Sequence, residues 1–465
     1  MRALFLVATA TAAIVPAAAF AQAMPGMEMP APAPAPTPTP APHDHAAMPG
    51  MDMPMPAPAS VQPPATQDDA MAGMDMGDHS PMPAHQGGSG TSRLPSRDGG
   101  QMAPHLMAGD WMLMAHGYAW GIYDHQSGPR GDNEAVVTSM AMLMAERSLD
   151  DHGSKLQFNT MLSLEPLMGQ RGYPSLFATG ETAHGSPLVD RQHPHDLFME
   201  LSGRLDIGIA KDTTAFLYGG PVAEPALGPS AFMHRASSRY LPLAPISHHW
   251  FDSTHITYGV VTAGISARTF QIEASAFRGR EPDENRWDIE TPKLDSWSAR
   301  FTWLPSPNWA VQVSHGRLKS PEAAHPGEDE ARTTASVQYS YGRLSAMLAF
   351  SAKDRLPGPT LTAWLAEANW EIGDHHTLFG RVENVANDEL FPDHASPLHD
   401  RIFRVTKAEA GYAYRIALTG SPEDAKWHLA LGGTVMAYAK PAALDAAYGR
   451  NPFGATVFAR LSFGD

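Results

Sequence analysis

Alternation of apolar and polar side chains along residues 106–465 constrains the fold of this chain more than any other feature of its sequence. In the stretch KLQFNTMLSLEP, Leu156, Phe158 and Leu162 share one face of an extended chain, whereas Gln157 and Asn159 share the other. A period of two is the signature of β-strands that have one apolar face. Helical periodicity of comparable strength is not found in this part of the sequence. The pattern predicts an all-β fold.

Counting such segments gives about sixteen strands. We place them at residues 110–125, 134–147, 154–167, 196–210, 213–223, 253–265, 268–279, 294–304, 308–319, 331–341, 343–352, 361–372, 375–387, 401–416, 425–439 and 453–463. Short connections alternate with long ones, of which residues 169–196 and 224–253 are the longest. Short turns at one rim and long loops at the other are typical of outer-membrane barrels. We therefore predict a transmembrane antiparallel up-and-down β-barrel, with both of its ends at the periplasmic rim.

Charged residues in the middle of the predicted strands separate a barrel from a soluble sandwich or propeller. Burying them unpaired in a sandwich core would be prohibitive, whereas a water-filled lumen can accommodate them. The residues concerned are Glu200, Arg204, Asp206, Glu273, Arg300, Glu367, Arg381, Glu383, Lys407, Glu409 and Arg460. Aromatic residues near the strand ends fit interfacial girdles; they are Trp111, Trp120, Trp297, Trp303, Trp309, Trp364, Trp370, Tyr339 and Tyr341.

The N-terminal residues predict export. Arg2 precedes an apolar run from Ala3 to Val15, and Ala19-Phe20-Ala21 forms a cleavage site, so we expect residues 1–21 to be a signal peptide. The chain has no cysteine, which fits an oxidising compartment and excludes thiolate metal sites. Its net charge of -16 argues against a nucleic-acid partner.

Residues 22–105 form a low-complexity segment that we predict to be disordered, because it cannot bury enough apolar surface to fold. Methionine and histidine gather in three clusters within it. Thioether sulfur is soft and uncharged, so it favours Cu(I), and by extension Ag(I), while imidazole also suits Cu(II). The predicted metal ligands of this tail are Met24, Met27, Met29, His43, His45, Met48, Met51, Met53, Met55, Met71, Met74, Met76, His79, Met82 and His85. The alternatives are compositional drift in a linker and sacrificial oxidation of methionine.

Histidines also concentrate in the long connections of the predicted barrel. The motif DRQHPHD contains His193, His195 and Asp196, and SHHWFDSTH contains His248, His249 and His255. Imidazole together with carboxylate could bind Cu(II) or another divalent ion. The alternative is that these rings pack within loops and bond to the backbone. The two readings weigh equally for the group.

Methionines recur on the first three predicted strands as well. Met161 lies on the polar face of its strand and is expected to point into the lumen. The faces of the others are not fixed by the pattern, and lipid-facing positions are expected for them; these residues are Met112, Met114, His116, Met140, Met142 and Met144.

The layout of signal peptide, Met/His-rich segment and barrel resembles copper-resistance outer-membrane proteins. Residues 225–264 resemble a segment of uncharacterised proteobacterial barrels linked to copper-handling loci. The barrel does not match the B-type copper-resistance family residue for residue. The resemblance covers the tail in composition and the remainder in architecture, and it implies a role in copper handling.

Catalytic motifs of the G-x-S-x-G, H-E-x-x-H and phosphate-loop kinds are missing from the sequence, so we expect no enzyme. We predict a barrel in the outer membrane whose periplasmic tail binds copper for sequestration or export. Its expected partners are outer-membrane lipid, copper ions as cargo and periplasmic copper carriers. The rival functions are a general substrate-diffusion porin with an incidental spacer and a surface structural or adhesive protein.

Overall fold

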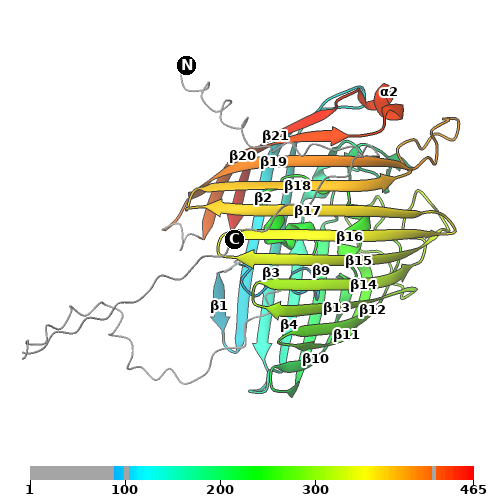
Figure 1. The fold of residues 1–465 in the computed structure, drawn as a ribbon. Helices are drawn as coiled ribbons and strands as arrows, with labels where there is room; N and C mark the ends of the chain where they lie inside the picture. Colours follow the sequence, from blue (N-terminus) through cyan, green and yellow to red (C-terminus); the bar gives the residue numbers. More distant parts are fainter. Residues whose placement is uncertain (1–87, 99–103, 421–425, 465) are drawn as a thin grey trace, which may run out of the picture. The chain divides into compact units, whose positions relative to one another are not determined.

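The computed structural model of the chain describes residues 88–98, 104–420 and 426–464. Its main feature is a closed ring of sixteen antiparallel strands (Figure 1), which confirms the predicted fold class. Each strand pairs with the next along the chain, and the last pairs with the first. The strands of the ring are β2 (Trp111–Gln126), β3 (Asn133–Ser148), β4 (Lys155–Leu162), β9 (Phe198–Ala210), β10 (Thr213–Ala223), β11 (Thr257–Ala267), β12 (Phe270–Phe277), β13 (Ser296–Ser306), β14 (Trp309–Leu318), β15 (Asp329–Tyr341), β16 (Leu344–Leu356), β17 (Thr360–Ile372), β18 (His376–Asn387), β19 (Phe403–Ala417), β20 (Trp427–Ala439) and β21 (Phe453–Phe463).

The predicted strands at residues 213–223 and 453–463 have the same bounds in the structure, and most others differ by one or two residues. Three predicted ends are wrong by more. The strand predicted to stop at residue 352 continues to Leu356, because it stays paired with β15 up to that residue. The strand predicted to reach residue 167 stops at Leu162, because the 3-10 helix η2 (Glu165–Met168) begins soon after and carries a proline in its first turn. The strand predicted from residue 253 begins at Thr257, because the 3-10 helix η5 (Ser253–His255) occupies the preceding residues.

Short and long connections fall at opposite rims, as predicted. Residues 211–212 join β9 to β10 at one rim, whereas residues 163–197 and 224–256 are long loops at the other rim. β2 starts and β21 ends at the short-turn rim, so both ends of the ring lie there. The additional strand β1 (His105–Ala108) pairs with the first residues of β2 at the same rim.

The outer face of the ring is apolar. Val137, Val435 and Val457 are 63%, 66% and 62% exposed, as expected for side chains that face lipid. Most of the predicted girdle tryptophans are likewise exposed, but Trp120 is buried and points inward. Trp120 shares its face of β2 with the buried Asp124, so its position near a strand end does not place it at the lipid interface.

The charged residues in the middle of the strands are all buried and point inward. The prediction of which face of each strand is turned to the interior is therefore confirmed at these positions. They pair with one another and with inward-folded loops: Arg381 Nε lies 3.0 Å from Glu367 Oε2, and Arg300 Nε lies 2.9 Å from Glu273 Oε1. At most of these positions the expected water-filled lumen is therefore replaced by buried ion pairs, whereas Glu200 accepts hydrogen bonds from Ser202 and Tyr218.

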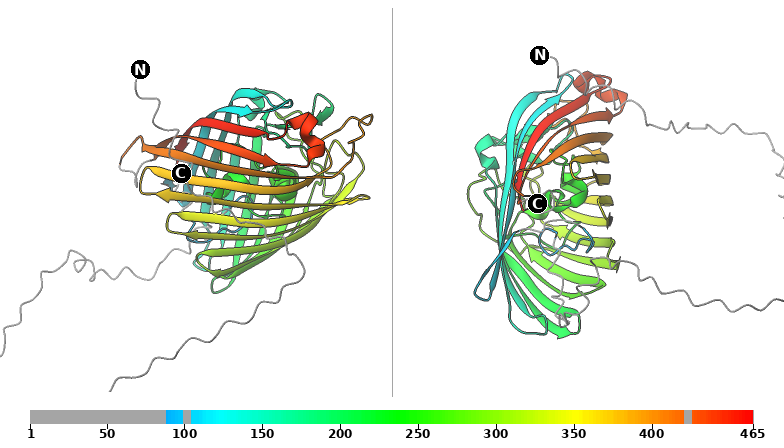
Figure 2. Two further views of the ribbon diagram at one scale, coloured as in Figure 1. Left: turned by 45° about the horizontal axis from the view of Figure 1, so that its top comes forward. Right: turned by 90° about the vertical axis from the view of Figure 1, so that its left-hand side faces the viewer.

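The two longest loops fold into the ring (Figure 2). Ser351 of β16 donates a hydrogen bond of 2.7 Å to the Trp250 carbonyl, and Glu383 of β18 accepts one of 2.9 Å from the Ser247 amide. The loops carry β5 (Tyr173–Pro174), β6 (Glu181–Ala183), β7 (Ser186–Leu188), β8 (Arg191–Gln192), η3 (Phe232–His234), η4 (Ala236–Ser238) and α1 (His248–Phe251); η6 (Ala442–Leu444) and α2 (Asp445–Tyr448) lie in the last loop. None of the helices in the described ranges has the length and apolarity that crossing a membrane requires.

Residues 88–98 also lie inside the ring. The Ser89 amide donates a 2.9 Å hydrogen bond to Ser230 Oγ of a long loop, and Thr91 donates to Glu273 of β12. Near the short-turn rim, the Arg97 amide bonds the Pro307 carbonyl at 2.9 Å. The disordered tail predicted for residues 22–105 thus extends too far at its C-terminal end, because polar lumenal partners hold this linker in place.

Candidate metal centre

Five of the predicted ligands meet inside the barrel. His193 and His195 come from the loop before β9, and His248, His249 and His255 come from the loop before β11. The ring centroids of neighbouring pairs lie between 5.2 and 5.8 Å apart. All of these rings except that of His195 belong to buried residues. The structure therefore gathers two sequence motifs into one histidine cluster.

Two overlapping sets of donor atoms could hold an ion. One set consists of His193, His248 and His249, and the other of Glu181, His249 and Glu281. In each set, the donor atoms all lie within 4.8 Å of one another. Nitrogen ligands of one tetrahedral zinc ion, bound at about 2.0–2.1 Å, are about 3.3–3.4 Å apart. We call the five residues of these two sets the histidine centre; they are His193, His248, His249, Glu181 and Glu281.

His248 is oriented by a carboxylate. Its Nδ1 bonds Asp252 Oδ1 at 2.8 Å, and both side chains are buried. Asp252 also accepts bonds from Arg235 Nη1 at 3.1 Å and from the Phe232 amide at 3.0 Å. Burial raises the pKa of Asp252, but its bond to His248 and the charges around it outweigh burial and hold that pKa well below its usual range. The charged carboxylate fixes Nδ1 as the donor and leaves Nε2 for a metal, the usual arrangement at metal-binding histidines.

His249 is shared by the two sets of donors and is held closely. A Cβ added at Gly180 would lie 2.5 Å from His249 Cγ, so only glycine fits beside this ring. Its Nδ1 lies 3.3 Å from Glu281 Oε1, but neither ring nitrogen has a hydrogen-bond partner among the described residues. Burial lowers the pKa of His249, yet the Glu281 carboxylate opposes this and leaves the pKa at about 9.

His193 presents its Nε2 to the same space. Its Nδ1 lies 3.1 Å from the Pro194 carbonyl, while Nε2 lies 3.5 Å from Glu181 Oε1 and has no hydrogen-bond partner in the described chain. Burial, reinforced by the charge of Arg286, lowers the pKa of His193 well below its usual value. Because its pKa is so low, the ring is neutral at pH 7, which is the form that binds metals. A buried ring nitrogen without a partner is costly unless a ligand satisfies it.

The other predicted ligands have different roles. His195 Nδ1 bonds Glu165 at 2.8 Å, and His255 Nδ1 bonds the Asp252 carbonyl at 2.6 Å. Asp196 binds Arg286 at 3.1 Å through one oxygen and accepts the Tyr258 hydroxyl through the other. Asp196 is therefore a structural anchor, and the prediction that it is a metal ligand gains no support from its contacts.

Glu181 and Glu281 complete the centre but are missing from the sequence prediction. Both lie in loops that contain several other acidic residues, and no spacing relative to the histidines distinguishes them. Glu181 is recognisable only in the fold, where Arg286 binds one of its oxygens at 3.1 Å while the other faces His193.

A second acidic group does not form a comparable site. Glu322, His325 and Glu389 bring their donor atoms within 4.8 Å of one another. Lys353 Nζ, however, lies 2.5 Å from Glu322 Oε1, and Arg355 Nη2 lies 2.6 Å from Glu389 Oε1. These cations neutralise the carboxylates, so the group functions as an ion-pair network.

The predicted tail ligands from Met24 to His85 lie outside the described residues. The histidine centre is thus the part of the predicted metal chemistry that the structure locates. Three imidazoles with two carboxylates suit Cu(II) or Zn(II) better than Mg(II) or Ca(II), which prefer oxygen ligands.

No family model matches the sequence, and no curated protein matches it. Among solved structures, the chain is similar to Salmonella typhi OmpF in complex with daunomycin (8% identity, 77% of this chain, 100% of that chain, TM-score 0.49). It is also similar to an anion-selective porin from Comamonas acidovorans (12% identity, 76% and 100%, TM-score 0.49). A third similar structure is OprB of Pseudomonas putida at high pH (9% identity, 76% and 94%, TM-score 0.46).

Proposed function

We propose that this protein is an outer-membrane barrel that binds copper, capturing it through the Met/His-rich tail and holding it at the histidine centre, for sequestration or export in metal resistance. The observation that carries the proposal is the buried histidine centre, where His193 Nε2 and both nitrogens of His249 have no hydrogen-bond partner among the described residues. An ion bound there could take one nitrogen from each of these two rings, while His249 Nδ1 lies 3.3 Å from Glu281 Oε1.

The tail and the lumen favour different oxidation states of copper. Thioether sulfur in residues 24–85 suits Cu(I), and the four histidines of the tail also suit Cu(II), whereas imidazole and carboxylate in the histidine centre suit Cu(II). The lumen thus offers Cu(II) a buried site without thioether ligands.

The apolar outer face of the closed ring supports a location in the outer membrane. In outer-membrane barrels the short turns face the periplasm, and residues 97–98 lie beside such a turn. This arrangement supports a periplasmic tail that receives copper from periplasmic carriers.

A general diffusion porin, the rival function, agrees less well with the lumen. Arg235 of the long loop binds Glu367 of β17 at 2.7 Å and Asp252 at 3.1 Å, with all three side chains buried. Such contacts fix the loop across the interior rather than leave an aqueous channel. Single-channel recording on the intact protein tests this, because a porin would conduct continuously, whereas we expect a closed barrel.

Copper binding is tested on the full chain purified in detergent. Cu(I) capacity is measured by competition with a chromogenic chelator, and Cu(II) is followed by electron paramagnetic resonance. Deleting residues 24–85 should remove most Cu(I) capacity and leave the lumenal Cu(II) signal. Replacing His193, His248 and His249 with alanine should do the reverse.

The matched control replaces three exposed histidines, His315, His375 and His376, with alanine. This variant should bind both ions as the wild type does. Equal loading of Cu(I) and Cu(II) in the wild type and in both test variants would refute the proposal.

A further inference from the structure

Methionine and histidine side chains cover one wall of the lumen. On β2, Met114 and His116 point inward, and their register partners on β3 are Met144 and Met142. Met142 in turn pairs with Met161 of β4, which is buried. The lipid-facing positions expected for most of these residues are therefore wrong, whereas Met161 points inward as predicted.

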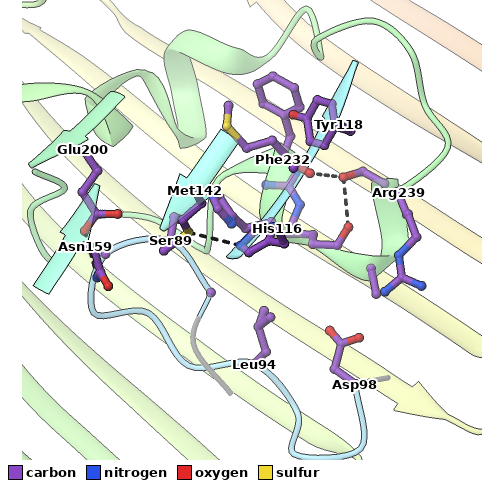
Figure 3. A pocket seen from close by; sticks show the side chains of 18 of the residues that line it. Ser89, Leu94, Asp98, His116, Tyr118, Met142, Asn159, Glu200, Phe232 and Arg239 are labelled. Atoms are coloured by element: carbon purple, nitrogen blue, oxygen red, sulfur yellow. Dashed lines mark hydrogen bonds between the residues drawn. The ribbon is translucent and has the colours of Figure 1, made fainter. Parts of the chain in front are cut away.

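Four of these side chains border an open space, whereas Met161 packs in a hydrophobic cluster with Met199 and Tyr258, against which Met142 also lies. A cavity of about 510 Å³ lies inside the barrel, between β2, β3, the long loops and residues 88–98 (Figure 3). Its lining includes Met114, His116, Met142 and Met144 on the strands and Met233 and His234 on the long loop. Residues 88–98 contribute the facing side through Leu94 and Asp98, among others. Ligands could therefore reach the sulfur atoms.

His116 and Met142 form the closest pair on this wall. His116 Nε2 lies 3.2 Å from Met142 Sδ, and Figure 3 shows the two side chains directed toward each other. Nitrogen and sulfur ligands of one tetrahedral zinc ion, bound at about 2.0–2.1 and 2.3 Å, are themselves separated by about 3.5–3.6 Å. The two atoms are thus already near the spacing that a shared ion of similar size requires.

Further sulfur donors are within reach through the sheet. Directly opposed residues in antiparallel strands have Cβ atoms about 4.5–5.5 Å apart, which a methionine side chain spans easily. Met161 is opposite Met142, and Met144 follows Met142 on the same face of β3. A second thioether can therefore join His116 and Met142 as a third ligand without a change in the backbone.

We infer that this wall is a second metal site, specific for a soft monovalent ion such as Cu(I) or Ag(I), with His116 and Met142 as its first ligands. Uncharged thioethers select such ions over harder divalent ones. The inference rests on the proposed copper function and extends it by assigning the reduced ion a site inside the barrel. We call it the thioether site.

A row of three histidine rings leads from the cavity to the histidine centre. His195 lines the cavity, its ring lies 5.2 Å from that of His255, and His255 lies 5.2 Å from His248. His255 Nε2 and His234 Nε2 have no hydrogen-bond partner in the described residues.

The simpler explanation is that these methionines only fill space, since methionine commonly occupies irregular gaps in a core. A site-specific readout separates the two explanations. The full-length mature chain is labelled with 13C in the methionine methyl groups and titrated with Ag(I) in detergent micelles. The Met142 resonance is assigned by its absence from the Met142→Leu spectrum, a substitution that conserves volume.

We expect the Met142 methyl signal to shift with Ag(I) and to stay unchanged with Zn(II). The shift should be lost in His116→Ala. Met347 provides the matched control, because it is also buried and inward-facing but lies on β16, away from the cavity.

A titration in which tail methionines shift and Met142 does not would overturn the thioether site while leaving the proposed function intact. If no methionine signal shifts with Ag(I), the result would contradict both the thioether site and the proposed function. A Met142 shift that persists in His116→Ala would show that the histidine is not a ligand and would also overturn the inferred pair.

Discussion

The role of Asp252 gives the most direct test of the histidine centre. Its carboxylate accepts the Nδ1 proton of His248 at 2.8 Å and is 2% exposed. Asp252→Asn keeps the size of the side chain and removes its charge. Loss of such an outer carboxylate typically weakens metal binding by about 10–100-fold, which corresponds to about 1.4–2.7 kcal/mol.

The upper half of that range is expected here. An asparagine has one acceptor oxygen, which must serve either His248 or Arg235, whereas the carboxylate serves both. The fold should survive, because Arg235 keeps its contact with Glu367 at 2.7 Å. Folding is checked by the change in gel mobility between unheated and heated samples.

The assay is competition for Cu(II) between the full chain and a chelator of known affinity, with the lumenal species followed by electron paramagnetic resonance. Asp196→Asn is the control, because that carboxylate is equally buried but binds Arg286 and Tyr258. We expect the control to bind Cu(II) as the wild type does. A folded Asp252→Asn protein with wild-type affinity would refute the argument that this carboxylate sets the orientation of His248.

Three further outcomes are expected. Gly180→Ala should displace His249, since the new Cβ would lie 2.5 Å from its ring, and should weaken lumenal Cu(II) binding at least about tenfold; Gly185→Ala, where nothing lies within 4 Å, should not. Arg235→Met removes the arginine from the buried Asp252 and leaves Glu367 with Arg381 alone. It should cost about 3 kcal/mol, the lower end of the range for breaking a buried pair, in urea unfolding followed by tryptophan fluorescence, and a cost under about 1 kcal/mol would contradict the pairing. The hydrogen bond that His325 donates to Glu389 raises the pKa of His325. The stabilisation from this bond is present below the unfolded pKa of about 6.5 and is lost as pH rises through the folded value. Hydrogen exchange in the loop of His325, corrected for intrinsic rates, should be slower at pH 6 than at pH 9, and equal protection would count against the pKa shift.

Strand positions were predictable because alternation and turn length are local properties. The faces of β2 were harder to assign, because both are apolar: Ala115 and Gly117 lie on one and Met114 on the other. The signal was present at the end of the strand, where Asp124 and Gln126 share the parity of Met114 and are buried. Counting from these polar residues would have placed the methionines in the lumen.

The site was predictable in part. His193, His248 and His249 were named because histidines were dense in two loops, and the fold brings those loops together. The partners Glu181 and Glu281 depend on how separate loops pack inside the ring, which no local pattern encodes. The same holds for Asp196, whose binding to Arg286 follows from tertiary packing alone.

The position of residues 88–98 bears on how the protein is assembled. This segment precedes β2 in the chain yet is enclosed by the ring that β2 and β21 complete. Pairing of β2 with β21 therefore encloses a segment that precedes both strands in the chain. The segment must enter the interior before these two strands pair, or it must be inserted into a barrel that has already closed. Thr91 contacts both Glu273 of β12 and Arg300 of β13. If the segment enters first, these contacts would position it while the neighbouring strands pair.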